Sequence, residues 1–286
     1  MRAVAGALLL LLGACHRGPP PPAPDAAVPA QTTVPELAAD ASIPEAGPAR
    51  TLPDVQTDWC LEGWRGLDEA TCYLLPGGEE DAGAEPRADP DELLIYLAGI
   101  VPPGGRSSPK EHVQRVVGNV ARRHHVAALL PRGRLGIGPR DAKDWWAWPT
   151  SAADYVKYAA ALTEEWRTER KALEDALGHP FKRVYLAGSS SGAYFLTLLA
   201  FAGAVDFDGY IATSGGAPGP GVSPKATRRP FYVGWGAGDP TNGGPKALIA
   251  HLKAQAWPAV GNEHQTGHGA REVYLDEALG FVRQSH

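Results

Sequence analysis

Residues 184–199 read VYLAGSSSGAYFLTLL, and the fold is decided by this stretch. A short apolar run enters a glycine- and serine-rich turn, and a second apolar run of helical length follows it. The turn contains the pattern G-x-S-x-G, with Ser190 between Gly188 and Gly192. A serine on a sharp turn between a strand and a helix needs small neighbours, because the turn is strained and crowded. The stretch therefore predicts an exposed reactive serine, Ser190; the alternative is a Gly-Ser-rich turn without chemistry.

Apolar runs typical of buried strands alternate with longer helical segments on both sides of this turn. The expected strands are 73–75, 93–97, 125–130, 183–187, 209–213 and 230–235. The expected helices are 109–123, 151–177, 193–202, 245–256 and 270–282. Ser151 and Asp154 are similar to a capping box, and Gly178 with Pro180 should end the helix that they begin. The alternation predicts one α/β domain with a mostly parallel, doubly wound sheet and helices on both faces.

From about residue 56 onward this pattern resembles the α/β-hydrolase superfamily, which contains esterases, lipases and peptidases. In that family the nucleophile comes first along the chain, the acid follows a late strand, and the histidine lies near the end. Residues 236–240 read GAGDP and are similar to the family's acid loop, so Asp239 is the expected acid. Residues 266–269 read TGHG, and His268 is the expected general base.

A second histidine, His264, lies four positions before His268 and is the rival candidate for the base. We prefer His268 because its small neighbours let a loop imidazole reach inward. The spacing of four also suggests zinc, but Gly267 argues against a helix there and no H-E-x-x-H motif is present. Neither a metal nor another cofactor is therefore expected.

The resemblance also implies an oxyanion hole made of two backbone N–H groups. One belongs to Ser191, the residue after the nucleophile. The other belongs to Gly99 or Ile100, in the loop after strand 93–97. Many relatives carry His-Gly in this loop, whereas this chain has Ala98 before Gly99.

Tryptophans crowd the loop before the long helix, at Trp145, Trp146 and Trp148. They either line an apolar substrate pocket or pack the loop onto the domain, and we favour packing.

Residues 1–14 resemble a bacterial lipoprotein signal peptide. Arg2 precedes an apolar run that is shorter than a helix needs to span a bilayer, and the run ends in Gly13-Ala14-Cys15. The resemblance implies lipid chains on Cys15, which hold a protein on a membrane. The alternative is an ordinary secretory signal. Residues 15–55 are rich in Pro and Ala and are expected to form a disordered tether before a domain at 56–286.

With Cys15 assigned to lipid, Cys60 and Cys72 are the remaining cysteines. In an exported protein such a pair is expected to form a disulfide, with two separate thiols as the alternative. A net charge of −5 without a dense basic run makes nucleic acid an unexpected partner.

These observations predict an exported, lipid-anchored serine hydrolase of the bacterial cell envelope that cleaves a carboxylic ester through an acyl-enzyme. A peptidase of the same fold is the alternative within enzymes. A catalytically idle surface binding protein is the alternative outside them, because fold does not fix function.

Overall fold

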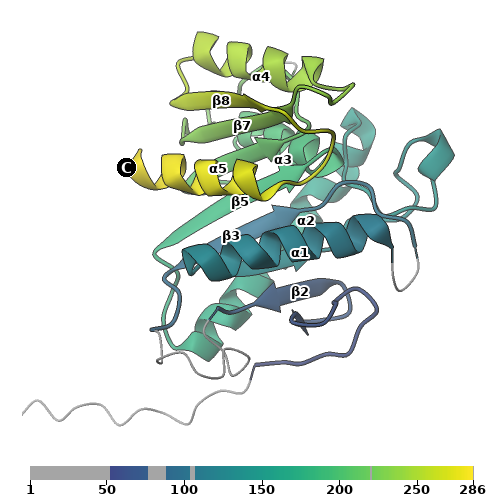
Figure 1. Ribbon diagram of the computed structural model, residues 1–286, viewed down its shortest axis with the longest axis vertical. Coiled ribbons are helices and arrows are strands. Elements are labelled where there is room, and N and C mark those ends of the chain that lie inside the picture. Colours follow the sequence, from purple (N-terminus) through teal and green to yellow (C-terminus); the bar gives the residue numbers. More distant parts are fainter. Residues whose placement is uncertain (1–51, 77–87, 104–106, 220, 286) are drawn as a thin grey trace, which may run out of the picture. The chain divides into compact units, whose positions relative to one another are not determined.

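The computed structural model describes residues 52–76, 88–103, 107–219 and 221–285 (Figure 1). The expected signal peptide, Cys15 and the tether up to residue 51 lie outside these ranges. Within them, no helix combines the length and the apolar character needed to cross a bilayer.

Strands and helices alternate along most of the described chain, as the sequence predicts. The strands are β1 (Arg65–Gly66), β2 (Thr71–Leu74), β3 (Glu92–Leu97), β4 (Ala127–Pro131), β5 (Arg183–Ser189), β6 (Gly209–Thr213), β7 (Phe231–Gly236) and β8 (Ala259–His264). The α-helices are α1 (Ser108–His124), α2 (Ala152–Leu177), α3 (Ser191–Ala202), α4 (Gly243–Ala254) and α5 (Glu272–Gln284). A short 3-10 helix (Arg140–Ala142) precedes α2.

The described strands form one sheet in the order β1-β2-β4-β3-β5-β6-β7-β8. From β4 to β8 every neighbouring pair is parallel, whereas β2 runs antiparallel to both β4 and β1. The predicted mostly parallel α/β sheet is therefore confirmed. The carboxyl ends of its parallel strands all lie at the same end of the sheet, which is where ligands of open α/β sheets bind.

Helices cover both faces of the sheet, because its central strands bury side chains in both directions. In β3, Leu93, Ile95 and Leu97 belong to the core under α2, α3 and α4. The alternate residues Leu94 and Tyr96 belong to the core under α1 and α5. Figure 1 shows α1 and α5 together in front of the sheet. This two-sided burial explains why the strand is apolar throughout rather than alternating.

The long helix α2 begins and ends where its sequence signals predict. Ser151 is the N-cap, and its hydroxyl accepts a hydrogen bond from the Asp154 backbone N–H at 3.1 Å. Gly178 ends the helix with a φ of 78°, a left-handed conformation that costs glycine little.

Two strands at the sheet edges differ from the sequence prediction, which contains neither. β8 has the sequence AVGNEH, and its residues are mostly half-buried. It lacks an apolar run because it is an edge strand that pairs only with β7. β1 has only two residues, too few for any periodicity.

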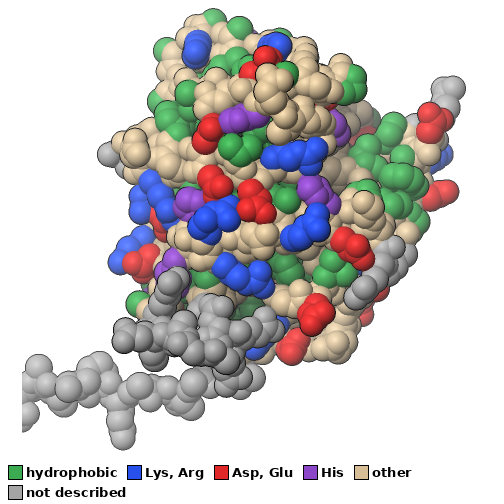
Figure 2. Space-filling model, in the orientation of Figure 1, with side chains coloured by type: hydrophobic (Ala, Val, Ile, Leu, Met, Phe, Trp, Pro, Cys, Tyr) green, Lys and Arg blue, Asp and Glu red, His purple; other side chains and the backbone are tan. Residues whose placement is uncertain are grey.

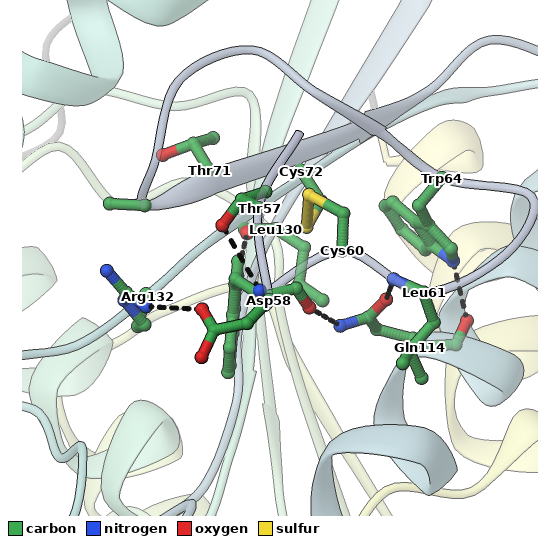
Figure 3. Close-up of a disulfide and its surroundings, with 12 residues drawn as sticks. Thr57, Asp58, Cys60, Leu61, Trp64, Thr71, Cys72, Gln114, Leu130 and Arg132 are labelled. Carbon is green, nitrogen blue, oxygen red and sulfur yellow. Dashed lines mark hydrogen bonds and ion pairs between the residues drawn. A yellow bond between two sulfur atoms is a disulfide. The ribbon is translucent and has the colours of Figure 1, made fainter. Parts of the chain in front are cut away.

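A disulfide joins Cys60 to Cys72, as predicted, with the Cα atoms 5.4 Å apart (Figure 3). It ties the segment 52–64, which we call the N-terminal strap, to β2. Buried Gln114 of α1 holds the strap from the other side. Its amide donates to the Trp59 carbonyl at 2.6 Å and accepts from the Leu61 N–H at 2.9 Å.

The strap also joins the sheet before residue 56, where the sequence places the start of the domain. The Val55 N–H donates to the Gly66 carbonyl at 2.9 Å, and the Tyr73 hydroxyl donates to the Pro53 carbonyl at 2.9 Å. The folded part therefore includes residues that the sequence assigns to the tether.

Candidate active site

Ser190 lies on the turn between β5 and α3, at the carboxyl end of the sheet. Its backbone has a φ of 52° and a ψ of −121°, a combination that non-glycine residues rarely adopt. A side chain on Gly192 would place Cβ 2.2 Å from the Leu97 carbonyl oxygen, and one on Gly188 would place it 2.7 Å from the Gly192 carbonyl carbon. Both glycines of the motif are therefore required by close backbone approach.

Asp239 follows β7 and is 1% exposed. Its Oδ1 accepts hydrogen bonds from the Thr241 hydroxyl at 2.7 Å and the Thr241 N–H at 2.8 Å. Its Oδ2 lies 2.9 Å from His268 Nδ1. Burial by itself raises the pKa of the Asp239 carboxyl, but the bonds from Thr241 and His268 outweigh burial and hold the pKa below its ordinary value. The carboxylate is thus ionised at neutral pH and accepts a hydrogen bond from the imidazole.

His268 lies in the loop between β8 and α5, with its side chain 41% exposed. Because ionised Asp239 can only accept, Nδ1 of His268 carries a hydrogen, and Nε2 of the neutral ring is left as an acceptor. The structure does not bring His264 to Asp239. Nε2 of His264 lies 3.2 Å from Glu277, and its ring packs against Tyr274.

Ser190 and His268 border one cavity of about 440 Å³. The other lining residues are small or apolar apart from Ser108, His112 and Ser189, and comprise Ala98, Gly99, Ile100, Val101, Pro109, Val113, Gly269 and Ala270. Its walls come from the loop after β3, the first turns of α1 and the loop that carries His268. The volume suits a small-molecule substrate.

The residues expected at the oxyanion hole lie at the same place. Gly99 and Ile100 line the cavity, and Ser191 is the first residue of α3. A Cβ on Gly99 would lie 3.1 Å from Ser190 Cβ, so the loop after β3 passes directly over the serine. The Ser191 N–H belongs to the first turn of a helix, where N–H groups lack intrahelical partners.

Three consecutive carbonyl groups fix the His268 loop, through residues that the sequence did not indicate. The His268 carbonyl accepts from Arg271 at 3.1 Å, and the Gly269 carbonyl accepts from Ser214 at 3.1 Å. The Ala270 carbonyl lies 2.8 Å from His112 Nε2. Arg271 directly follows the loop, but Ser214 and His112 lie far from it in the chain, so no local sequence signal joins them to it.

The tryptophans before α2 do not line this cavity. Trp148 is 1% exposed, stacks on Phe195 and donates its indole N–H to the Ala98 carbonyl at 2.7 Å. Trp146 pairs with Val101 in a β-bridge. The favoured interpretation as a packing clamp is therefore correct for these two, and Trp148 supports the loop that precedes Gly99.

Within the described residues, no group of three His, Cys, Asp or Glu side chains is placed to hold a metal ion. His264 and His268, whose spacing of four residues suggests zinc, have separate carboxylate partners, Glu277 and Asp239.

Neither a protein-family model nor a curated protein matches this chain. Solved structures do match. Esterase PE8 is 17% identical, with a TM-score of 0.51, and the match covers 75% of this chain and 97% of that one. YahD, solved with malic acid, is 14% identical with a TM-score of 0.52, covering 76% and 100%. A variant of SOBER1 from Arabidopsis thaliana is 15% identical with a TM-score of 0.52, covering 68% and 99%. At these identities the likeness concerns the fold.

Proposed function

Since the chain has the α/β-hydrolase fold, we propose that it is a serine hydrolase that cleaves carboxylic esters with Ser190, His268 and Asp239. One observation carries the proposal: His268 borders the same cavity as Ser190 while its Nδ1 is bonded to buried, ionised Asp239. The strained backbone of Ser190 adds support, because strain of this kind gathers at functional sites.

In the first half of the reaction, Ser190 Oγ attacks the ester carbonyl carbon and its proton passes to Nε2 of His268. Asp239 stabilises the imidazolium that forms. The N–H groups of Ser191 and of Gly99 or Ile100 donate to the oxyanion. The C–O bond then breaks, and the alcohol leaves with the proton from His268.

In the second half, a water molecule attacks the acyl-enzyme and gives its proton to His268. The tetrahedral intermediate collapses to a carboxylic acid, and the proton returns to Ser190 Oγ. Every proton is carried by His268, and no cofactor enters the balance.

We favour an ester over a peptide bond because esterase PE8 has the same fold. This support is analogy of fold, so bond type needs its own assay. Turnover of short 4-nitrophenyl esters without cleavage of matched peptide anilides is the expected result.

A fluorophosphonate probe tests the nucleophile without knowledge of the substrate. We expect labelling on the peptide that contains Ser190, and loss of labelling in Ser190→Ala. Ser223→Ala is the matched control, because Ser223 does not border the cavity, and it should label as the wild type does. A folded wild type that stays unlabelled from pH 7 to 9 would favour an idle binding protein instead.

We also propose that the chain is exported and held on a membrane of the bacterial cell envelope by lipid on Cys15. The support is the sequence Gly13-Ala14-Cys15, which resembles the end of a bacterial lipoprotein signal peptide, and the apolar segment ahead of it. The Cys60–Cys72 disulfide agrees with an oxidising compartment.

A further inference from the structure

The charge around the Ser190 cavity is one-sided. Among the described residues that line it, none is an Asp or a Glu, and the titratable ones are His112 and His268. Asp239 lies behind His268, is almost fully buried and is paired. A ligand in this cavity therefore meets no exposed carboxylate from its described walls.

Two arginines that do not themselves line the cavity flank His112, which does. Arg271 Nη1 lies 3.0 Å from His112 Nε2, and Arg115 Nη2 lies 3.4 Å from His112 Nδ1. Arg271 also donates to the carbonyls of His268 and Ala270, at 3.1 and 3.0 Å. Its guanidinium thus contacts three residues that line the cavity.

Neither arginine has a carboxylate partner among the described residues, although most of the other described arginines do. Arg123, further along α1, pairs with Asp276 at 2.9 Å and with Glu272 at 3.0 Å. A guanidinium has five N–H donors. The carbonyl bonds of Arg271 leave donors for a further acceptor, and Arg115 has only its contact with His112.

Figure 2 shows the face on which α1 and α5 lie, with Lys, Arg and His side chains across it. Acidic side chains also lie on this face. Between the two helices, Arg123 of α1 pairs with Glu272 and Asp276 of α5. Arg115 and Arg271, which lack such partners among the described residues, form a cluster with His112 that we call the basic rim.

We infer that the ester cleaved at Ser190 carries a carboxylate, which binds at the basic rim. This inference rests on the proposed function and names the substrate class of that site. A carboxylate matches the planar fork of a guanidinium, which forms two parallel hydrogen bonds with it. The substrate class is therefore either a half-ester of a dicarboxylic acid, or an ester formed at the hydroxyl group of a hydroxy acid whose carboxylate is free.

Paired esters test the inference directly. Two 4-nitrophenyl esters of equal acyl length, one ending in a carboxylate and the other in its methyl amide, place the charge on the acyl side. A second pair places it on the alcohol side. After subtraction of spontaneous hydrolysis, we expect kcat/KM to favour the charged member of one pair by about tenfold at low salt, from two partly exposed contacts.

Arg115→Gln is the informative variant, because the one side-chain hydrogen bond of Arg115 among the described residues is with His112. We expect it to reduce the ratio of kcat/KM for the charged ester to kcat/KM for the neutral ester about threefold. Arg122→Gln is the matched control on the same helix, two turns away, and should keep the full preference. Raising ionic strength to 1 M should reduce the preference in the wild type, because exposed charges are screened.

The outcomes separate the two proposals. If the neutral esters are cleaved and Ser190 labels, but neither charged ester is preferred, the basic rim does not select the substrate and this inference fails alone. If no ester is cleaved and the probe does not label the folded protein, the proposed function fails and the inference fails with it. A preference that Arg115→Gln and Arg122→Gln reduce equally would also overturn the assignment to the rim.

Discussion

Ser190 has a backbone conformation that costs a non-glycine residue on the order of 1–3 kcal/mol. Its neighbours hold it there. The Ser190 N–H donates to the Thr213 carbonyl, and its own carbonyl accepts from the Tyr194 N–H, both at 3.1 Å. Gly215 passes so close that a Cβ there would lie 2.5 Å from the Ser190 carbonyl oxygen. The strain is therefore fixed by the surrounding backbone rather than by the serine side chain.

Asp239→Asn tests the acid that orients His268. An amide can donate to Nδ1, which would favour the imidazole tautomer that cannot accept the Ser190 proton. We expect kcat for a neutral ester to fall about 10³–10⁴-fold, with KM nearly unchanged and the fold retained. The measurement is steady-state hydrolysis beside a urea unfolding curve. A fall below tenfold in a folded variant would remove Asp239 from the proposed triad.

Helix α2 carries a titratable group that the proposed reaction does not use. Glu169 is 8% exposed and accepts a hydrogen bond from the Thr71 hydroxyl of β2 at 2.6 Å. Burial is the main cause that raises its pKa to about 7, helped by the nearby charges of Asp68 and Glu165 and opposed by the bond from Thr71. Its second oxygen, Oε2, is buried without a hydrogen-bond partner.

This pKa predicts how stability depends on pH. The folded protein holds the Glu169 proton up to about pH 7, while the unfolded chain releases it near the ordinary value of 4.5. The contribution of Glu169 to the free energy of unfolding therefore falls as pH rises from 4.5 to 7, by on the order of 3 kcal/mol. Glu169→Gln should remove this loss. The free energy of unfolding of the variant, relative to that of the wild type, should therefore rise as pH increases from 4.5 to 7. Urea unfolding at pH 5 and pH 8 measures it.

The control for that series is Glu164→Gln, an exposed position on the same helix whose carboxylate pairs with Arg167. It should follow the wild-type pH dependence. Equal slopes for wild type and Glu169→Gln would show that the buried carboxyl ionises as it does in the unfolded chain.

Elements with strong local signals were predictable, and those defined by pairing were not. β6 was predicted at its observed bounds because GYIAT is a short run with the aromatic and β-branched residues that favour strands, and all five residues are buried. β8 was missed because its hydrogen bonds to β7, not its side chains, make it a strand. The site divides in the same way. Ser190, Asp239 and His268 follow recognisable turns, whereas Ser214 and His112 reach the His268 loop only through the tertiary fold.

For the molecule as a whole, all of the described residues belong to one compact unit, within residues 47–286. The proposed chemistry lies entirely in this unit, whereas Cys15, the proposed point of membrane attachment, lies outside the described residues. Activity and anchoring should therefore be separable by substitution.

Cys15→Ser tests this separation. In a bacterial host fed a labelled fatty acid, the wild type should take up label and partition into detergent, while Cys15→Ser should do neither. Hydrolysis by the two proteins in detergent should be equal. Cys60→Ser is the matched cysteine control and should keep the lipid label. Label retained in Cys15→Ser would overturn the anchoring proposal.

The N-terminal strap also determines how a pull on the chain would be distributed. A force applied ahead of Leu52 first loads the bonds of Pro53 and Val55 to β2 and β1. Asp58 and Trp59 come next along the chain, and their carbonyls accept hydrogen bonds from Lys110 and Gln114 of α1. The attachment after these is covalent, at Cys60–Cys72. The cross-link acts as a covalent stop, so tension on the N-terminal region cannot extend the strap beyond Cys60 while the disulfide is intact.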